Sequence, residues 1–156
     1  MATGLLHLHN ILRWVVLLLL IVVFLKSLAG RGGQKAFTSG DRKSAMFLMI
    51  FADIQLLIGL LLYFMGPWGI KNIQSQGMGP IMSNSVNRYW AVEHLIGMLL
   101  AIILIHIGYN VVKKNVSDTA KFKKLFWTTG LALLILLLMI PWPFRELIGR
   151  PWFPGM

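Results

Sequence analysis

Four long apolar runs constrain the fold of this chain more than any other feature of its sequence. Charged residues are rare within residues 5–26, 45–64, 89–112 and 123–140. A helix needs about 20 residues, at about 1.5 Å each, to cross about 30 Å of hydrocarbon. The four runs therefore predict four transmembrane helices. Lys26 follows the first run instead of preceding it, which favours a permanent helix over a cleavable signal peptide.

The segments between the runs predict how these helices are arranged. The first and third connections are short, which forces the helices that they join to lie antiparallel. The outer loop 65–88 contains two glycine–proline clusters that predict turns, and Pro141 ends the fourth helix. We therefore expect one transmembrane domain over residues 1–156, an all-α antiparallel four-helix bundle with the tail 141–156 along its outer surface. Tryptophans at the outer boundaries suit an anchoring aromatic belt: Trp68, Trp90, Trp142 and Trp152.

The basic residues predict the orientation of the bundle. The formal net charge is +10, and most of the fifteen lysines and arginines lie at the first and third connections. Because positively charged loops stay in the cytoplasm, both termini and the loop 65–88 are expected to face outward. These charges then face the lipid bilayer rather than nucleic acid. They are Lys26, Arg31, Lys35, Arg42, Lys43, Lys113, Lys114, Lys121, Lys123 and Lys124.

Ionisable residues within the apolar runs are the strongest indication of function. A charged side chain near the centre of a membrane helix costs about 2.5–3.5 kcal/mol on insertion scales, so each must face the bundle interior and find a partner. Counted at about 1.5 Å per residue, His9, Glu93 and His94 lie about 6–8 Å from the outer edge and Arg13 about 12 Å. We expect an outer cluster in which the ends of the first and third spans lie side by side.

Two histidines of this cluster suit the axial positions of a b-type haem. Axial haem ligands are usually imidazoles, and His9 and His94 occur at matching depth on different helices. Gly97 and Ala101 share a helix face with His94, which lets another helix or a flat porphyrin approach closely. Arg13 would neutralise a propionate or join an ion pair. A single haem is expected, because no second histidine lies at the depth of His106.

A transition-metal site is an alternative for the same end of the bundle. His7, His9, Glu93 and His94 supply nitrogen and oxygen ligands that suit zinc or copper. His7 and His9 point about 200° apart on a helix, which argues against both joining one site. In a haem protein Glu93 would instead orient a histidine. The chain has no cysteine, which excludes disulfides and thiolate sites.

Asp53 is expected about 16 Å from the outer edge, close to the midplane of the membrane. Asp53 and Glu93 would relay protons, a common role of intramembrane carboxylates, or either would form a structural ion pair with Arg13. His106 lies about 25 Å from the outer edge and about 120° around the helix from His94. We interpret His106 as a polar residue that bridges helices.

Five motifs are spread over nearly the whole chain: His9-x-x-Leu12-Arg13-Trp14, Asp53-Ile54-Gln55-Leu56-Leu57-x-Gly59, Ala91-Val92-Glu93-His94, His106-Ile107-Gly108 and Pro141-Trp142-Pro143-Phe144-Arg145. Taken together, they resemble a bacterial family of small four-helix membrane proteins labelled cytochrome-b-like. A histidine early in the first helix is more distantly similar to SirB, CopD and HemJ membrane proteins, of which HemJ is associated with haem. The resemblance implies functional roles for His9, Arg13, Asp53, Glu93, His94 and His106. It also implies a bacterial inner membrane, with both termini and the loop 65–88 on the periplasmic side.

These observations predict an inner-membrane protein that binds haem b through His9 and His94, with Arg13, Glu93 and His106 as further cofactor-site residues. Its role would be electron transfer with a quinone or with the subunits of a redox complex, and it would associate with further copies of itself. The alternative is a structural or accessory membrane subunit without a cofactor, in which the same residues only position the helices. The sequence shows no catalytic Ser/His/Asp set, phosphate loop or paired catalytic carboxylates, so enzymatic activity stays open.

Overall fold

The computed structural model describes residues 2–154, and within this range the chain is helical without strands. Four of the helical stretches are long and apolar enough to cross a membrane: Thr3–Gly30, Ser39–Gln76, Ser85–Val112 and Asp118–Met139. The prediction of an all-α chain with four apolar helices is therefore confirmed. The elements are α1 (Ala2–Gly30), α2 (Ser39–Met65), α3 (Ile70–Gln76), α4 (Met78–Ser83), α5 (Ser85–Arg88), the π-helix η1 (Tyr89–Glu93), α6 (His94–Val112) and α7 (Asp118–Met139).

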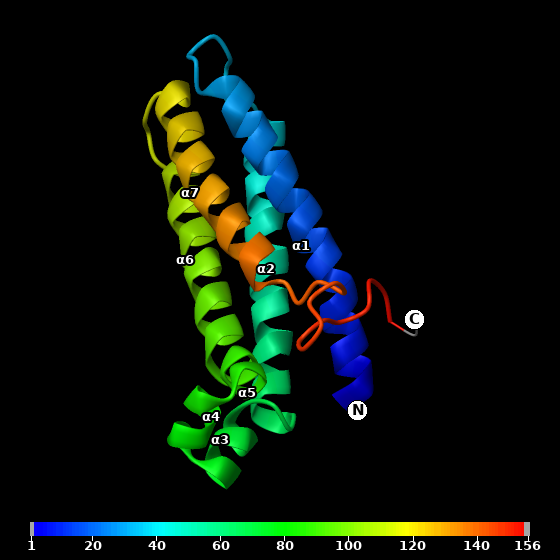
Figure 1. The fold of residues 1–156 in the computed structure, drawn as a ribbon. Coiled ribbons are helices and arrows are strands. Elements are labelled where there is room, and N and C mark those ends of the chain that lie inside the picture. Colours follow the sequence, from blue (N-terminus) through cyan, green and yellow to red (C-terminus); the bar gives the residue numbers. More distant parts are fainter. Residues whose placement is uncertain (1, 155–156) are drawn as a thin grey trace.

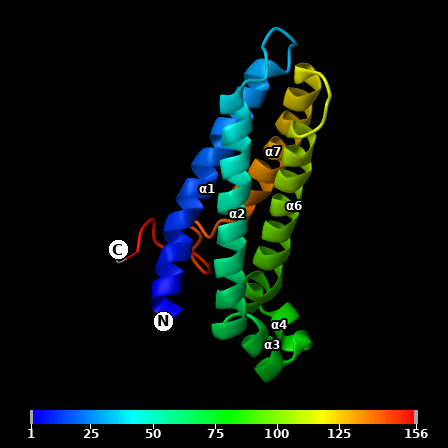
Figure 2. The ribbon, with the colours of Figure 1, turned by 180° about the vertical axis from the view of Figure 1, so that it is seen from behind.

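The four long helices form a ring in which α1 packs on α2 and α7, and α6 packs on α7 and α2. Consequently α1 and α6 lie diagonally across the bundle rather than side by side (Figures 1 and 2). The connections 31–38 and 113–117 lie together at one end, called the inner end here. The N-terminus and the short helices α3 and α4 lie at the opposite, outer end (Figure 1).

Hydrogen-bonded caps begin the two helices that leave the inner end. Thr38 and Asp41 form a capping box, in which each side chain accepts from the other residue's backbone N–H. Lys26 of α1 reaches Asp41 at 3.4 Å and the Ser44 hydroxyl at 2.9 Å, which ties α1 to the start of α2. Ser117 caps α7 by accepting from the Ala120 N–H. These short, capped turns fix neighbouring helices at this end.

Small residues let α6 and α7 approach closely. A Cβ atom on Gly97 would collide with the Met139 side chain, and one on Gly108 would collide with Thr128. Of the two uses expected for the small residues beside His94, close approach of a helix is the one that the structure has. The face near Gly97 is filled by α7 and does not hold open space for a flat ligand.

The loop 65–88 forms the expected turn at its first glycine–proline cluster, residues 66–69, but not at its second. It contains α3, α4 and α5, and the Gly79–Pro80 pair lies within α4. Proline is tolerated in the first turn of a helix because the N–H that it lacks has no intrahelical partner there. Gly77 separates α3 from α4 with a φ of 81°, which is accessible to glycine without strain.

Candidate functional site

His9 of α1 and His94 of α6 meet across the centre of the bundle near its outer end. Their ring centroids are 6.5 Å apart and the ring planes are inclined by 66°. Their helices are diagonal neighbours, so the two imidazoles reach each other through the middle of the ring. The structure thus brings together the two histidines that the depth count placed at one level.

The π-helix η1 determines where His94 points. A π-helix bonds residue i to residue i+5, which stacks residues five apart on one side of the helix. Here the His94 N–H donates to the Tyr89 carbonyl. Both side chains consequently reach one acceptor, the Met139 carbonyl of α7, at 2.6 Å from the Tyr89 hydroxyl and 3.0 Å from His94 Nδ1. A carbonyl only accepts, so Nδ1 carries the proton and the lone pair of His94 lies on Nε2.

The acceptor exists because α7 ends early. With 22 residues against 29 in α1, it is about 10 Å shorter, and the tail that follows turns sideways toward α1 (Figure 1). The last carbonyls of a helix have no intrahelical partner, and hydrocarbon offers none. Each is bonded here: Leu136 by the Ile140 N–H, Leu137 by Trp142 Nε1, Leu138 by Arg145, and Met139 by Tyr89 and His94.

His9 is positioned mainly by α2. The Gln55 side chain donates to the His9 backbone carbonyl at 3.0 Å. Gly59 lies directly opposite the ring, where an added Cβ would be 3.1 Å from His9 Cε1. A glycine at this position therefore makes room for the imidazole. His7 has no contact with this cluster among the recorded hydrogen bonds and ring contacts of the described residues.

The C-terminal tail is fastened to α1 beside this site. Arg13 donates to the Trp152 carbonyl at 3.1 Å and to the Pro151 carbonyl at 3.4 Å, and Trp14 Nε1 donates to the Trp152 carbonyl at 2.9 Å. The Trp14 ring lies 5.9 Å from the rings of both Trp152 and Phe153. Arg13 thus holds the tail and is not paired with Asp53 or Glu93, the two partners that we expected for it.

Five buried side-chain atoms in residues 2–154 have no hydrogen-bond partner: His9 Nδ1, Asn10 Oδ1, Arg13 Nε, Gln55 Oε1 and Arg150 Nε. They lie in one region. Gln55 bonds to His9, while Asn10 and Arg13 bond to Pro151, the residue after Arg150. Buried polar atoms are rarely left unpaired, and such atoms commonly mark an ordered water or ligand. The region combines two guanidinium groups with an imidazole and two amide oxygens.

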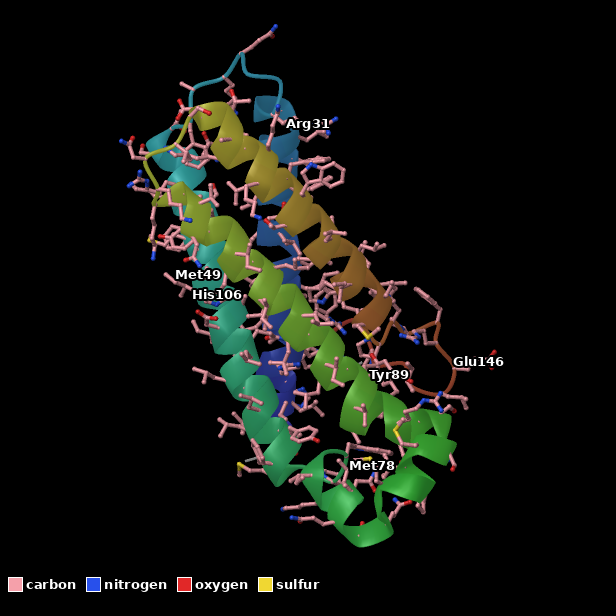
Figure 3. All side chains as sticks on the ribbon, turned by 90° about the vertical axis from the view of Figure 1, so that its left-hand side faces the viewer. Arg31, Met49, Met78, Tyr89, His106 and Glu146 are labelled. Carbon is pink, nitrogen blue, oxygen red and sulfur yellow. The ribbon has the colours of Figure 1, made fainter. Side chains whose placement is uncertain are left out.

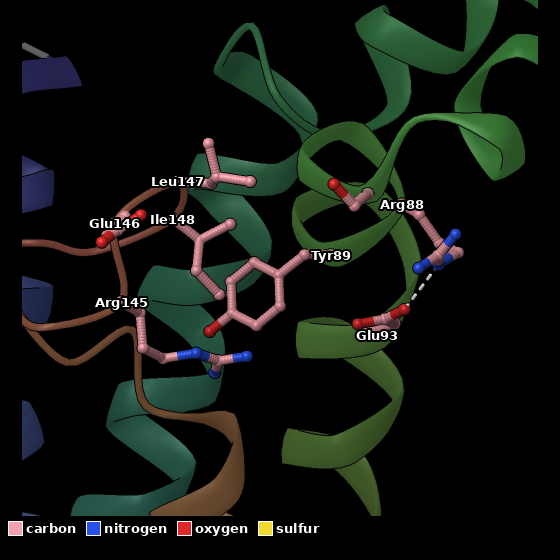
Figure 4. Close-up of a pocket in the computed structure, with 8 residues that line it drawn as sticks. Arg88, Tyr89, Glu93, Arg145, Glu146, Leu147 and Ile148 are labelled. Atoms are coloured by element: carbon pink, nitrogen blue, oxygen red, sulfur yellow. Dashed lines mark hydrogen bonds and ion pairs between the residues drawn. The ribbon is translucent and has the colours of Figure 1, made fainter.

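Glu93 points away from the histidines. Its carboxylate accepts from Arg88 Nε at 2.7 Å, and both side chains are more than one third exposed. They border a cleft of about 440 Å³ between η1 and the tail (Figure 4), lined by Ser85, Arg88, Tyr89, Glu93, Arg145, Glu146, Leu147 and Ile148. Tyr89 lies between the cleft and the histidine pair, because its ring lines the cleft and its hydroxyl lies 3.5 Å from His94 Nδ1.

Asp53 and His106 form an ion pair or hydrogen bond with each other, 2.8 Å apart. Asp53 thus pairs with neither Arg13 nor Glu93, and His106 does bridge α6 to α2. The depth count placed them about 9 Å apart because it assumed that the outer edges of the two spans lie at one level. The contact requires that the two spans begin at different levels.

Comparison with known proteins identifies no relative. No family model matches the chain, and neither a curated protein nor a solved structure matches it. The functional argument therefore depends on the geometry of the site.

Sequence reasoning missed several residues that build this site. Tyr89, Gln55 and Gly59 are ordinary residues in an apolar helix, and nothing in their spacing signals contact with a histidine. Nor did this reasoning identify Asn10, Arg13 and Trp14 as one set, yet all three contact the tail. A signal was available for this, since positions i, i+3 and i+4 share one helix face.

Proposed function

We propose that this protein binds one b-type haem between α1 and α6, with His9 and His94 as axial ligands. The observation that carries the proposal is the pair of imidazoles facing each other from different helices, with centroids 6.5 Å apart. Metal–imidazole bonds of about 2 Å would place two rings on opposite sides of one metal about 6 Å apart. Bound haem iron supplies one-electron redox chemistry.

Hydrogen bonds and unpaired polar atoms around the histidines support the proposal, although the porphyrin would have to lie away from the face near Gly97, which α7 fills. The Nδ1–H of His94 donates to the Met139 carbonyl, which is the usual way in which a protein orients a ligating imidazole. Arg13 and Arg150 each keep a buried Nε without a partner near the pair, which suits the carboxylates of propionates. The His9 imidazole would be the second ligand of the haem iron, and Gly59 leaves room for its ring.

The site offers too few protein ligands for a bare metal ion. Among the described residues no three side chains of His, Cys, Asp or Glu converge on one point. Zinc sites take three or four protein ligands. Haem iron needs only one or two, because the porphyrin supplies the others. His9 and His94 therefore suit haem better than zinc or copper.

The same proposal includes the membrane topology. We infer an antiparallel bundle in a bacterial inner membrane, with both termini and the cleft on the periplasmic side. The lysines and arginines of the connections 31–38 and 113–117 support this orientation, because positively charged loops stay in the cytoplasm. The resemblance to cytochrome-b-like membrane proteins points to the same compartment.

The decisive experiment is an absorption spectrum of the full-length protein purified in detergent after expression with ample haem. We expect a Soret band that shifts on reduction with dithionite. The variants His9→Gln and His94→Gln should each lose at least 90% of the band, or about tenfold in bound haem, because each removes an axial ligand. His106→Gln is the matched control and should keep the band. A colourless wild-type protein contradicts the proposal.

A quinone head group is the partner that we propose for the outer cleft, which has a volume of about 440 Å³. Two arginines, two glutamates and Tyr89 offer hydrogen bonds there, and Leu147 and Ile148 offer apolar contacts. Filling the cleft by Leu147→Trp should weaken binding of a short-chain quinone, measured by calorimetry, at least tenfold, which is about 1.4 kcal/mol. The Soret band should be unchanged, and an unchanged quinone affinity would exclude the cleft.

A structural role is the second candidate, and one observation favours it. His94 and Tyr89 together bond the last carbonyl of α7, which is a sufficient reason for both residues in a protein without a cofactor. In that case His94→Gln should lower stability, whereas His9→Gln should not. Haem binding predicts instead that both variants lose the same absorption band.

A further inference from the structure

The Asp53–His106 pair lies on the outside of the bundle, halfway along its length. Its two side chains come from α2 and α6 and are 42% and 41% exposed. In Figure 3 the labelled His106 lies beside Met49, on the side of the molecule formed by α2 and α6. Asp53 is near the middle of α2, which extends from Ser39 to Met65. The pair would therefore meet acyl chains rather than head groups.

Apolar side chains surround this polar pair. Leu57, one turn after Asp53 on α2, is 63% exposed, and Ile103, one turn before His106 on α6, is 52% exposed. Ionisable residues in membrane helices almost always face protein or water, because lipid offers them no hydrogen bonds. An imidazole–carboxylate pair open to lipid at this depth is consequently covered by protein in the membrane.

The chemistry of the pair indicates which protein covers it. The contact uses His106 Nε2 and Asp53 Oδ1, which leaves His106 Nδ1 and Asp53 Oδ2 for a further partner. The surface is self-complementary, because it presents one donor and one acceptor side by side. A second copy related by a two-fold axis presents the same two groups in the opposite order.

We propose that α2 and α6 form the interface of a symmetric homodimer, in which Asp53 and His106 of each copy bond those of the other. The two carboxylates and two imidazoles then alternate in a closed ring of four hydrogen bonds, and their charges cancel when each imidazole carries both protons. Leu57 and Ile103 pack around this ring and shield it from lipid. This dimer is independent of haem binding, since His9 and His94 lie inside the bundle.

Site-directed cross-linking in native membranes tests this interface directly. The chain contains no cysteine, so every introduced thiol is the only one. Leu57→Cys and Ile103→Cys place it beside the polar pair. Leu18→Cys on α1 and Leu134→Cys on α7 are matched controls, because these residues are 61% and 56% exposed and lie on the other two helices of the ring. A short bis-maleimide should convert the first two variants, and not the controls, to a species of twice the chain mass.

Substitutions of Asp53 and His106 test how much the pair contributes to dimer formation. Asp53→Asn and His106→Leu change both copies, so each affects the two bonds between the chains and should raise the dimer dissociation constant in detergent by about eightfold to three-hundredfold, twice the free energy of one hydrogen bond between membrane helices. The exchanged variant Asp53→His with His106→Asp keeps both groups and should restore the dimer, which separates lost association from misfolding.

Three outcomes would overturn the proposal. The first is equal cross-linking at all four cysteine positions, and the second is a monomer at every protein concentration. The third is a cross-linked product with the mass of a different protein, which would assign the surface to another subunit. Cross-linking at Leu57 and Ile103 that is lost in Asp53→Asn and regained in the exchanged variant supports it.

Discussion

The two ends of this bundle differ in whether their buried polar groups have hydrogen-bond partners. At the inner end Ser27 donates to a carbonyl of its own helix, Thr129 does the same, and Asp41 accepts from Thr38 and Lys26. At the outer end, five buried atoms on α1, α2 and the tail have no partner within the described residues. Both ends contain buried polar atoms, so composition alone does not explain the contrast.

Under the proposed function, this difference separates an inner end that stabilises the fold from an outer end that would bind haem. A buried polar group without a partner lowers stability by about 1–3 kcal/mol. Proteins tolerate such groups mainly where function requires them. Substitutions at the inner end should therefore lower stability, whereas those at the outer end should chiefly affect binding of the proposed haem.

The largest effect is expected from Phe122→Ala at the inner end. Phe122 is fully buried, packs on Phe37 at a centroid distance of 5.0 Å, and faces Gly30 so closely that no side chain fits there. Removing the ring leaves a cavity and should lower the free energy of unfolding by about 3 kcal/mol or more, measured by titration with a denaturing detergent. Phe144→Ala, at a ring that is 73% exposed, is the control. Equal losses of unfolding free energy in the two variants would contradict a special role of the inner end in stability.

An intermediate effect is expected from Asp41→Ala. This change removes the capping box of α2 and the partner of Lys26 together, so the free energy of unfolding should fall by about 1–2 kcal/mol. Asp118→Ala provides the comparison, because Asp118 is exposed and lies 3.8 Å from Lys121. Its loss should be below about 0.5 kcal/mol. Similar values for the two variants would show that the inner end does not depend on this cap.

The smallest effect on stability is expected from Arg13→Met at the outer end. The variant loses two bonds to tail carbonyls but also removes a charge whose Nε has no partner. The lost bonds lower stability and the removal of the charge raises it, so the free energy of unfolding of the haem-free protein should change by less than about 0.5 kcal/mol. The haem content should nevertheless fall, as measured by the Soret band. A variant that is destabilised but keeps its full haem content would show that Arg13 stabilises the fold and does not bind haem.

The helices were largely predictable and the outer connections were not. Hydropathy located four spans because about 20 apolar residues suffice to cross a bilayer. The structure begins α7 at Asp118, five residues before the expected start, because Ser117 caps it there. The loop 65–88 was assigned to turns from its glycines and prolines, although Pro80 is compatible with the first turn of α4.

The site was predictable in part. Equal depth on two helices predicted that His9 and His94 would meet, since depth follows from counting residues. The same count failed for Asp53 and His106, because it cannot detect that two spans begin at different levels. Nor does counting reveal that Glu93 turns toward Arg88, since the π-helical turn changes the direction of the side chains that follow it.

By itself the sequence determined that this chain is helical, has four helices long and apolar enough to cross a membrane, and concentrates its polar groups in a few places. Hydrophobic length and charge are properties of short segments, so they can be evaluated without knowing the fold. Only the tertiary structure decided that α7 ends early, that the tail is fastened to Arg13, and which polar groups stay unpaired at the outer end. Those outcomes depend on contacts between residues up to about 140 positions apart, and no local pattern encodes them.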